Sequence, residues 1–140
     1  MSDMFQIIPI GIIRKTTDQT WMEIDPKYQK AMNGLDLYSH IYVLYWFHEN
    51  DTPEQRQILE VHPCNNPVNP LTGVFATHSP MRPNLIALTL CHILSIDGLC
   101  IWLKDIDARD ATPVIDIKGY FPYDIQETIR HPNWERRQVG

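Results

Sequence analysis

The stretch LIALTLCHILSIDGLCIWL, residues 85–103, decides the fold class of this chain. Its first part, residues 85–96, is long and apolar and predicts a β-strand. The dipeptide Asp97-Gly98 is typical of a hairpin turn, so the remaining residues are expected to return antiparallel to that strand. Residues 40–48, HIYVLYWFH, are apolar at almost every position and predict another strong strand, with both faces covered.

Shorter elements fill the rest of the chain. Further strands are predicted over residues 5–14 (FQIIPIGIIR, with a bend or bulge at Gly11), 73–77 and 112–117. Short helices are predicted from an N-cap at Asp25 to a C-cap at Gly34, over residues 52–60, and as one turn after Pro122. Strands dominate, so the sequence predicts a mainly β fold: a small antiparallel β-barrel with short helices, in a single domain over residues 1–140.

The composition places limits on function. The 140 residues carry a net charge of −5, which argues against a protein that binds nucleic acid through a generally basic surface. A local basic patch is still able to hold RNA. No run approaches the roughly 18 apolar residues of a membrane span, and the N-terminus lacks the basic region of a signal peptide, so no membrane association is expected. Three cysteines without a motif spacing indicate reduced thiols and a cytoplasmic protein.

Common catalytic and cofactor motifs are missing from the chain. It contains no GxGxxG or P-loop glycine pattern, and no HExxH, CxxC or GxSxG motif. Six histidines invite a metal hypothesis, in which His62 joins Cys64, or His48 and Glu49 converge with His78. No such pair has an established ligand spacing, so no metal is expected.

Four aspartates, Asp105, Asp107, Asp110 and Asp116, surround the last predicted strands. They do not fit the EF-hand pattern, because its glycine and its final glutamate are missing. Aspartate favours turns by bonding its own backbone, and this is the preferred explanation. The alternative is that one or two of these carboxylates meet a cationic or polyhydroxylated ligand such as a ribose.

Six segments in order resemble one known family. They are residues 10–14 (IGIIR), 34–40 (GLDLYSH), 44–48 (LYWFH), 73–77 (GVFAT), 82–84 (RPN) and 107–118 (DARDATPVIDIK). Together they resemble the TsaA-like family, also called TrmO-like or YaeB-like, over about residues 6–123. The resemblance implies a small β-barrel methyltransferase that uses S-adenosyl-L-methionine and works as a homodimer. It also implies tRNA as substrate, since the best-known members N-methylate N6-threonylcarbamoyladenosine at position 37 of tRNA.

The resemblance also implies a set of cofactor-binding residues. These are His48, Glu49, His78, Leu88, Lys104, Asp105, Ile106 and Asp107. No catalytic residue is assigned, and the candidates for a proton acceptor are Glu49, His48 and Asp116. A basic end of the chain, with Arg130, Arg136 and Arg137, is a candidate for contact with phosphate.

The chain departs from the family pattern at several positions. His78 stands where arginine is usual, Glu49 where glutamine is common, Leu85 where proline is, Ala87 and Ala111 where glycine is, and Gly119 where proline is. We also expect no counterpart of the C-terminal extension found in longer members. These departures leave two alternatives open: a methyltransferase of a small metabolite, which the sequence pI of 5.6 favours, and a non-catalytic module that binds S-adenosylmethionine.

Overall fold

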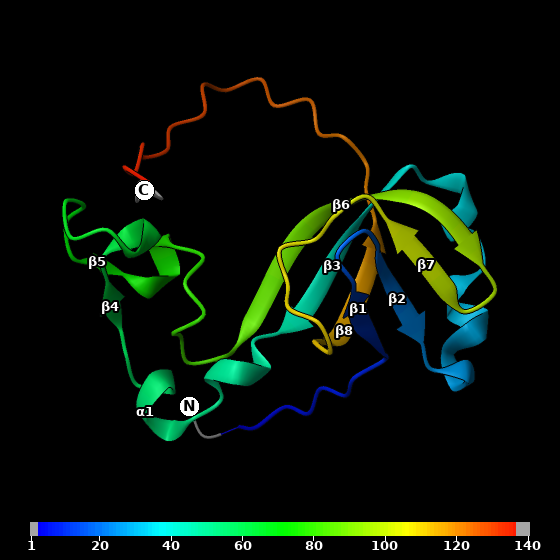
Figure 1. Cartoon of the computed structure of the whole chain (residues 1–140). Helices are drawn as coiled ribbons and strands as arrows, with labels where there is room; N and C mark the ends of the chain where they lie inside the picture. Colours follow the sequence, from blue (N-terminus) through cyan, green and yellow to red (C-terminus); the bar gives the residue numbers. More distant parts are fainter. Residues whose placement is uncertain (1–2, 137–140) are drawn as a thin grey trace. The chain divides into compact units, whose positions relative to one another are not determined.

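Six antiparallel strands close into a barrel in the computed structural model, which describes residues 3–136 (Figure 1). In barrel order they are β1 (Gly11–Lys15), β2 (Thr20–Ile24), β7 (Cys100–Leu103), β6 (Ile86–Asp97), β3 (His40–Trp46) and β8 (Pro113–Gly119), and β8 pairs back onto β1. The barrel belongs to a first compact unit, residues 3–46 and 86–121. The predicted mainly β fold with a small antiparallel barrel is therefore confirmed.

Alternate side chains along the strands fill the core of this unit. The side chains with no exposed surface include Ile13, Met22, Ile41, Val43, Ile101 and Val114. Full burial of one such side chain contributes roughly 1.5–3 kcal/mol to stability. Because a slip by one residue would turn a strand's apolar side chains outward, the core also fixes the register of the strands.

The first strand begins later than predicted. β1 starts at Gly11 and residues 3–10 form no strand, so the prediction over residues 5–14 is wrong in its first half. Pro9 has no N–H to donate to a ladder, and the apolar side chains around it remain exposed. No register shift marks a bulge at Gly11 either. A Cβ at Gly11 would lie 2.5 Å from the carbonyl oxygen of Glu23, so glycine is needed for the close approach of β1 to β2.

Two further strands differ from the sequence-based prediction. β2 is not among the predicted strands, because it has only five residues and these lie between a polar turn and a helix cap, which dominate the local sequence pattern. β3 was expected to be covered on both faces, but only the face of Ile41, Val43 and Tyr45 is buried. Its other face is half-exposed and lies beside the outer face of β6, where Leu44 is opposite Leu88. The run of apolar residues in β3 therefore reflects an apolar outer surface of the barrel.

Caps and turns of the first unit follow the local sequence. Asp25 caps the 3-10 helix Pro26–Met32, because its carboxylate accepts a hydrogen bond of 3.0 Å from the backbone N–H two residues later. The helix ends at Asn33 rather than at the predicted Gly34, although Gly34 does take the left-handed conformation with φ 93°. The predicted hairpin turn is confirmed, with Gly98 at φ 59° between β6 and β7.

Residues 47–85 and 122–136 form a second compact unit. It contains the helix α1 (Pro53–Arg56) and a two-stranded sheet of β4 (Glu60–Val61) and β5 (Thr72–Gly73). The remaining short 3-10 helices are Leu35–Leu37 in the first unit, and His48–Asn50, Pro63–Asn65 and Val74–Ala76 in the second. Across residues 3–136, no helix is long and apolar enough to cross a lipid bilayer.

Several predictions for the second unit are wrong. The helix predicted over residues 52–60 is confirmed only at its start, where Thr52 caps α1. The strand predicted over residues 73–77 is a 3-10 turn after β5, in which a hydroxyl bonds a local carbonyl instead of a neighbouring strand. No residue of 122–136 is helical, which contradicts the turn predicted after Pro122. Almost every side chain there is exposed, so no buried face stabilises a helix.

Candidate functional site

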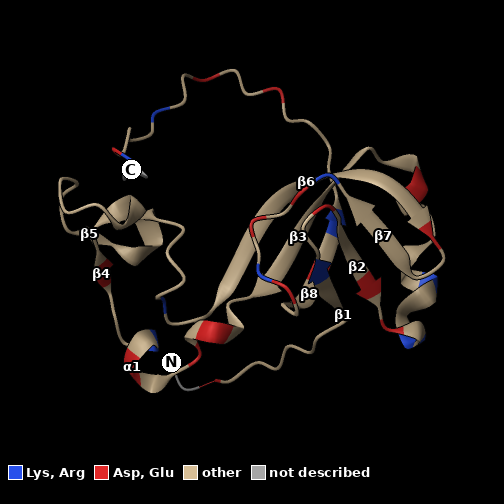
Figure 2. Cartoon of the chain, viewed as in Figure 1, with Lys and Arg blue, Asp and Glu red and all other residues tan. Residues whose placement is uncertain are grey.

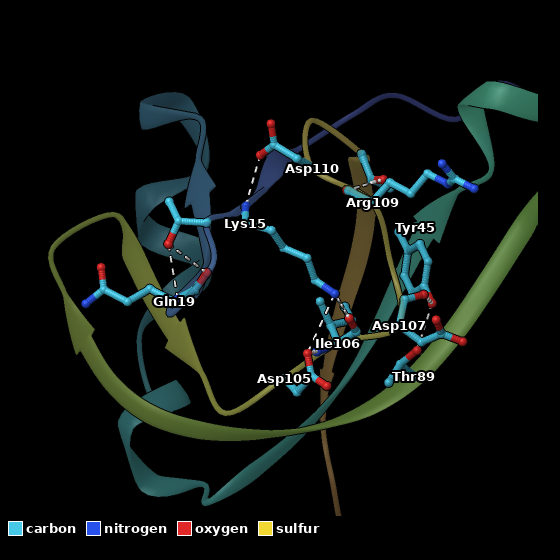
Figure 3. Close-up of polar contacts among 11 residues, drawn as sticks. Lys15, Gln19, Tyr45, Thr89, Asp105, Ile106, Asp107, Arg109 and Asp110 are labelled. Atoms are coloured by element: carbon cyan, nitrogen blue, oxygen red, sulfur yellow. Dashed lines mark hydrogen bonds and ion pairs between the residues drawn. The ribbon is translucent and has the colours of Figure 1, made fainter. Parts of the chain in front are cut away.

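The segment between β7 and β8 carries four of the predicted cofactor residues, of which Figure 3 labels Asp105, Ile106 and Asp107. We call residues 104–112 the 104–112 loop. The Ile106 side chain is buried, with 1% of its surface exposed, whereas Lys104, Asp105 and Asp107 are exposed. One apolar side chain thus anchors the loop, and the polar residues on either side of it face outward.

Lys15, at the end of β1, makes three contacts with this loop (Figure 3). Its Nζ donates a hydrogen bond to the carbonyl oxygen of Ile106 and lies 3.6 Å from the carboxylate of Asp105. Its backbone N–H donates to Asp110 at 2.9 Å. Asp105 also accepts a hydrogen bond of 2.8 Å from the N–H of Ile106. A single lysine therefore fixes the loop at two places.

Tyr45 of β3 holds the next carbonyl of the loop (Figure 3). Its hydroxyl donates to the carbonyl oxygen of Asp107 and lies 2.9 Å from the hydroxyl of Thr89 on β6, which donates to it in turn. Tyr45 is 3% exposed, and this burial raises its pKa above the ordinary value of 10.0. The hydrogen bond from Thr89 offsets part of that rise, and the charge of Asp107 adds to it. The hydroxyl therefore stays protonated and able to donate at neutral pH.

The far end of the loop is fixed by its own backbone. Ala111 donates its N–H to the carbonyl oxygen of Ile13 at 2.8 Å, and the Thr112 hydroxyl donates to the carbonyl oxygen of Arg109 at 2.7 Å. Ala111 has φ 68°, a left-handed conformation that is unfavourable for any residue with a Cβ. The loop therefore follows one path from β7 to β8, at the expense of strain at this alanine.

Asp107 offers a ligand both an acceptor and a donor. Within the part of the chain that the structure describes, its carboxylate makes no hydrogen bond or ion pair, and its backbone N–H has no acceptor. The Asp105 carboxylate is already engaged by Lys15 and by the loop backbone. A carboxylate accepts hydrogen bonds from ribose hydroxyls and attracts a cation. Asp107 is therefore the loop residue best suited to a positively charged nucleoside.

Leu88 lies on the outer face of β6, 55% exposed, while its neighbour Thr89 faces Tyr45. The structure therefore does not bring Leu88 into the hydrogen-bond network of the 104–112 loop. Across β3 from Leu88 lies Asp116 of β8, one of the candidate proton acceptors. Asp116 is exposed and 3.7 Å from the ammonium group of Lys118.

His48 and Glu49 belong to the second unit and are neighbours on its first 3-10 turn, His48–Asn50. The turn begins directly after Phe47, whose N–H donates to the carbonyl oxygen of Leu85 at 2.8 Å. His48 is half-buried and Glu49 is exposed. These two residues thus share one local element, whereas the third predicted residue of this unit, His78, lies on a different loop.

The loop that carries His78 is held from inside by Arg82. One guanidinium nitrogen of Arg82 donates to three carbonyl oxygens, of Ser79 at 3.0 Å, Thr77 at 3.1 Å and Val74 at 3.4 Å. The His78 side chain is exposed on this loop. The arginine therefore fixes the backbone on both sides of His78 while leaving its imidazole accessible to a ligand.

The metal hypothesis gains nothing from the structure. Among residues 3–136, no group of three or more His, Cys, Asp or Glu side chains could hold a metal ion. His62 uses its Nδ1 in a 2.8 Å hydrogen bond with the carbonyl oxygen of Asn69, which gives it a local structural role.

The family model described as the tRNA-methyltransferase O N-terminal domain matches residues 5–124 of this chain. The match covers the six barrel strands and the 104–112 loop. The chain belongs to the TrmO N-terminal domain family.

Relatives in the TrmO family differ in what their names state. A probable S-adenosyl-L-methionine-binding protein of Pyrococcus horikoshii is 48% identical over 116 residues, covering 83% of this chain and 82% of the relative. Another protein so named, from Methanocaldococcus jannaschii, is 43% identical and covers 82% of this chain and 91% of the relative. The human tRNA (adenine(37)-N6)-methyltransferase is 36% identical over 105 residues, covering 74% of this chain and only 23% of the human protein.

The fold agrees with solved TrmO structures. The crystal structure of TrmO from Pseudomonas aeruginosa superposes with a TM-score of 0.70 at 27% identity, covering 94% of this chain and 62% of that one. This chain therefore spans about three-fifths of the length of the bacterial TrmO chain.

Two residues that hold the 104–112 loop, Lys15 and Tyr45, are absent from the predicted site. Tyr45 carries a usable signal, because a buried tyrosine among aliphatic residues needs a partner for its hydroxyl. Lys15 carries none, since its contact with Ile106 joins residues 91 positions apart. A known TrmO-family pattern identifies the loop itself but not the side chains that support it.

Proposed function

We propose that this chain binds S-adenosyl-L-methionine through the 104–112 loop. The observation that carries the proposal is that the carboxylate and N–H of Asp107 have no partner among residues 3–136, on a loop with a fixed backbone path. Support comes from relatives named as S-adenosyl-L-methionine-binding proteins. The residues proposed to contact the cofactor are His48, Glu49, His78, Leu88, Lys104, Asp105, Ile106 and Asp107. Ile106 would offer only the second lone pair of its carbonyl oxygen, because its side chain is buried and its N–H already bonds Asp105.

The proposed activity is methylation of N6-threonylcarbamoyladenosine at position 37 of tRNA. The name of the human relative supports N6-methylation of adenine 37 in tRNA, although this chain matches less than a quarter of that protein. When bound, S-adenosylmethionine would supply a methyl group that its sulfonium activates for transfer to the acceptor nitrogen. The chain's part is to orient the acceptor, exclude water and receive the nitrogen's proton. His48, Glu49 and Asp116 are the proposed acceptors of that proton.

A second candidate is a module that binds S-adenosylmethionine without catalysing transfer, or that methylates a small metabolite. The archaeal relatives are named for binding alone, which favours the first of these. The net charge of −5 favours a small acceptor over tRNA. The basic end of the chain is the counter-argument: Arg130 and Arg136 are exposed, and Arg137 lies outside the described residues.

Two measurements separate these functions. S-adenosylmethionine should raise the melting temperature of the purified protein, because a ligand selective for the folded state stabilises it. A methyl-labelled cofactor, incubated with tRNA that carries or lacks the threonylcarbamoyl group, should label only the modified tRNA. Label that appears only in a small-molecule fraction would identify the metabolite enzyme, and binding without any transfer would identify the module. If millimolar S-adenosylmethionine leaves the melting temperature unchanged, all three proposed functions are contradicted.

The contribution of His78 has its own test. Its imidazole is accessible on a loop fixed by Arg82, so His78→Ala should weaken cofactor binding without unfolding the loop. The control variant is His131→Ala, which removes another exposed imidazole of the second unit and should leave cofactor binding unchanged. An unchanged dissociation constant for His78→Ala would remove this residue from the proposed site.

We further propose that the chain forms a homodimer in the cytoplasm and acts as one TsaA-like domain. The outer face of β6 supports the dimer: Ile86, Leu88, Leu90 and Leu94 are all exposed along one strand. Figure 2 shows that β3 and most of β6 carry no charged residue, so this surface suits protein rather than phosphate. Light scattering should give the mass of a dimer, which Leu90→Lys should reduce to a monomer. Gln19→Lys, the same charge change at an exposed turn, should have no effect.

A further inference from the structure

We propose that Lys15 and Tyr45 are positioning residues for cofactor binding: they hold two consecutive carbonyls of the 104–112 loop so that Asp107 faces the ligand. This inference rests on the proposed function. Neither residue is one of the proposed cofactor contacts, and each acts on the ligand only through the loop.

The two contacts hold consecutive carbonyls of the loop and come from different strands. Lys15 of β1 holds the carbonyl of Ile106, and Tyr45 of β3 holds the carbonyl of Asp107. β1 and β3 are not neighbours in the barrel, since β8 lies between them. The loop is therefore fixed from two separate points on the barrel wall, and a change at one does not remove the other.

Because the peptide bond is planar, the contact at the Ile106 carbonyl also sets the direction of the Asp107 N–H. In a trans peptide the carbonyl oxygen and the following N–H point in opposite directions. With the Ile106 carbonyl held toward Lys15, the N–H of Asp107 points away from the lysine. That N–H has no acceptor among the described residues. It stands beside the unpaired Asp107 carboxylate, so one residue presents a donor and an acceptor to a ligand.

The ammonium group of Lys15 also forms an ion pair with Asp105, whose side chain is 81% exposed. Its Nζ lies 3.6 Å from the carboxylate of Asp105, and the Lys15 side chain is only 28% exposed, so its charge is partly shielded from solvent. Without the lysine, the Asp105 carboxylate loses its ion pair and the Ile106 carbonyl loses a charge-assisted hydrogen bond. Lys15→Met keeps the length of the aliphatic stem while removing both interactions.

The test is isothermal titration of S-adenosylmethionine into four variants and the unaltered protein, well below every melting temperature. Lys15→Met should raise the dissociation constant about tenfold, which corresponds to about 1.4 kcal/mol. Lys15→Arg should restore binding to within about threefold, because arginine keeps the charge and the donors. Tyr45→Phe should weaken binding in the same direction, since it removes the hydroxyl and keeps the ring. The control is Lys118→Met, which breaks an exposed ion pair on β8 and should leave the dissociation constant unchanged.

The outcomes distinguish this inference from the proposed function. If the unaltered protein does not bind S-adenosylmethionine, the proposed function fails and the positioning role fails with it. If it binds and Lys15→Met binds within twofold of it, the positioning role alone is overturned. Equal losses in Lys15→Met and Lys15→Arg would also overturn it, because they would show general damage to the barrel. Loss in methionine with rescue by arginine supports it.

Discussion

The side-chain amide of Asn69 makes two hydrogen bonds to the backbone of Glu135, 66 residues further along the chain. Its Nδ2 donates to the carbonyl oxygen at 2.8 Å, and its Oδ1 accepts from the N–H at 2.9 Å. Asn69 is 5% exposed and is one of only two buried polar residues in the described chain. It therefore fixes the end of the otherwise exposed tail, residues 122–136, within the second unit.

Asn69→Ala should release this tail. Two backbone groups of Glu135 and the carbonyl of Pro63 lose their partner, at an expected cost of about 1–3 kcal/mol. Limited proteolysis should then cleave residues 122–136 faster than in the unaltered protein. Asn66→Ala is the matched control, because Asn66 makes one longer bond of 3.3 Å to the same carbonyl. Equal cleavage rates for all three proteins would contradict the role given to Asn69.

Ala111→Gly should stabilise the barrel. Ala111 stands at φ 68° where the family pattern has glycine, and removal of its Cβ relieves a left-handed strain of about 1–2 kcal/mol. The greater freedom of glycine in the unfolded chain offsets part of the gain, so a net gain of about 0.5–1 kcal/mol is expected. Chemical denaturation measures it. Ala108→Gly, where φ is not positive, should instead destabilise the protein, and a lower midpoint for Ala111→Gly would refute the argument from strain.

Gly11→Ala should destabilise the barrel by about 1–3 kcal/mol. The new Cβ would meet the carbonyl oxygen of Glu23 at 2.5 Å, and β1 could accept it only by moving away from β2. The comparison is Gly73→Ala, where the nearest atom to the new Cβ is 4.0 Å away and no strain follows. Thermal unfolding should separate the two variants by several degrees, and coincident curves would argue against the close approach.

The cysteines should differ in reactivity toward alkylating reagents. Burial raises the pKa of the Cys91 thiol from 9.0 to about 12, and the charge of Asp105 adds to the rise. At pH 9 the folded protein should therefore modify at the exposed Cys64 and not at Cys91, until denaturant is added. The raised pKa of Cys91 also makes the stability of the folded protein depend on pH. Between pH 9 and about 12 the unfolded thiol releases its proton while the folded one keeps it, so stability falls as the pH rises. Mass spectrometry of the labelled peptides checks the first expectation.

The sequence predicts those parts of the fold that depend on neighbours in the chain. The β6–β7 hairpin follows from an apolar run and a local Asp-Gly turn, and the cap at Asp25 from its own side chain. β2 escapes prediction because its strand character comes from pairing with β1 and β7. The same applies to β5, where a short pairing with β4 replaces the longer strand that the composition favours.

The candidate site also has one part that the sequence predicts and one part that it does not. The Lys104–Asp107 segment follows from a family pattern along the chain, and the structure explains why Ile106 belongs to it, since that side chain anchors the loop. Lys15 and Tyr45 could not be found in this manner, because contacts over 91 and 62 positions leave no local signal.

The closed barrel determines how this protein can change over generations. The path of the 104–112 loop depends on Lys15 and Tyr45 of the barrel strands and on Asp105 and Ile106 within the loop, rather than on the Asp107 side chain that it displays. Substitutions of the displayed Asp107 side chain therefore alter what the loop recognises and leave its course intact. A descendant lineage could acquire a new ligand preference through one or two surface replacements, with little loss of foldability along the way.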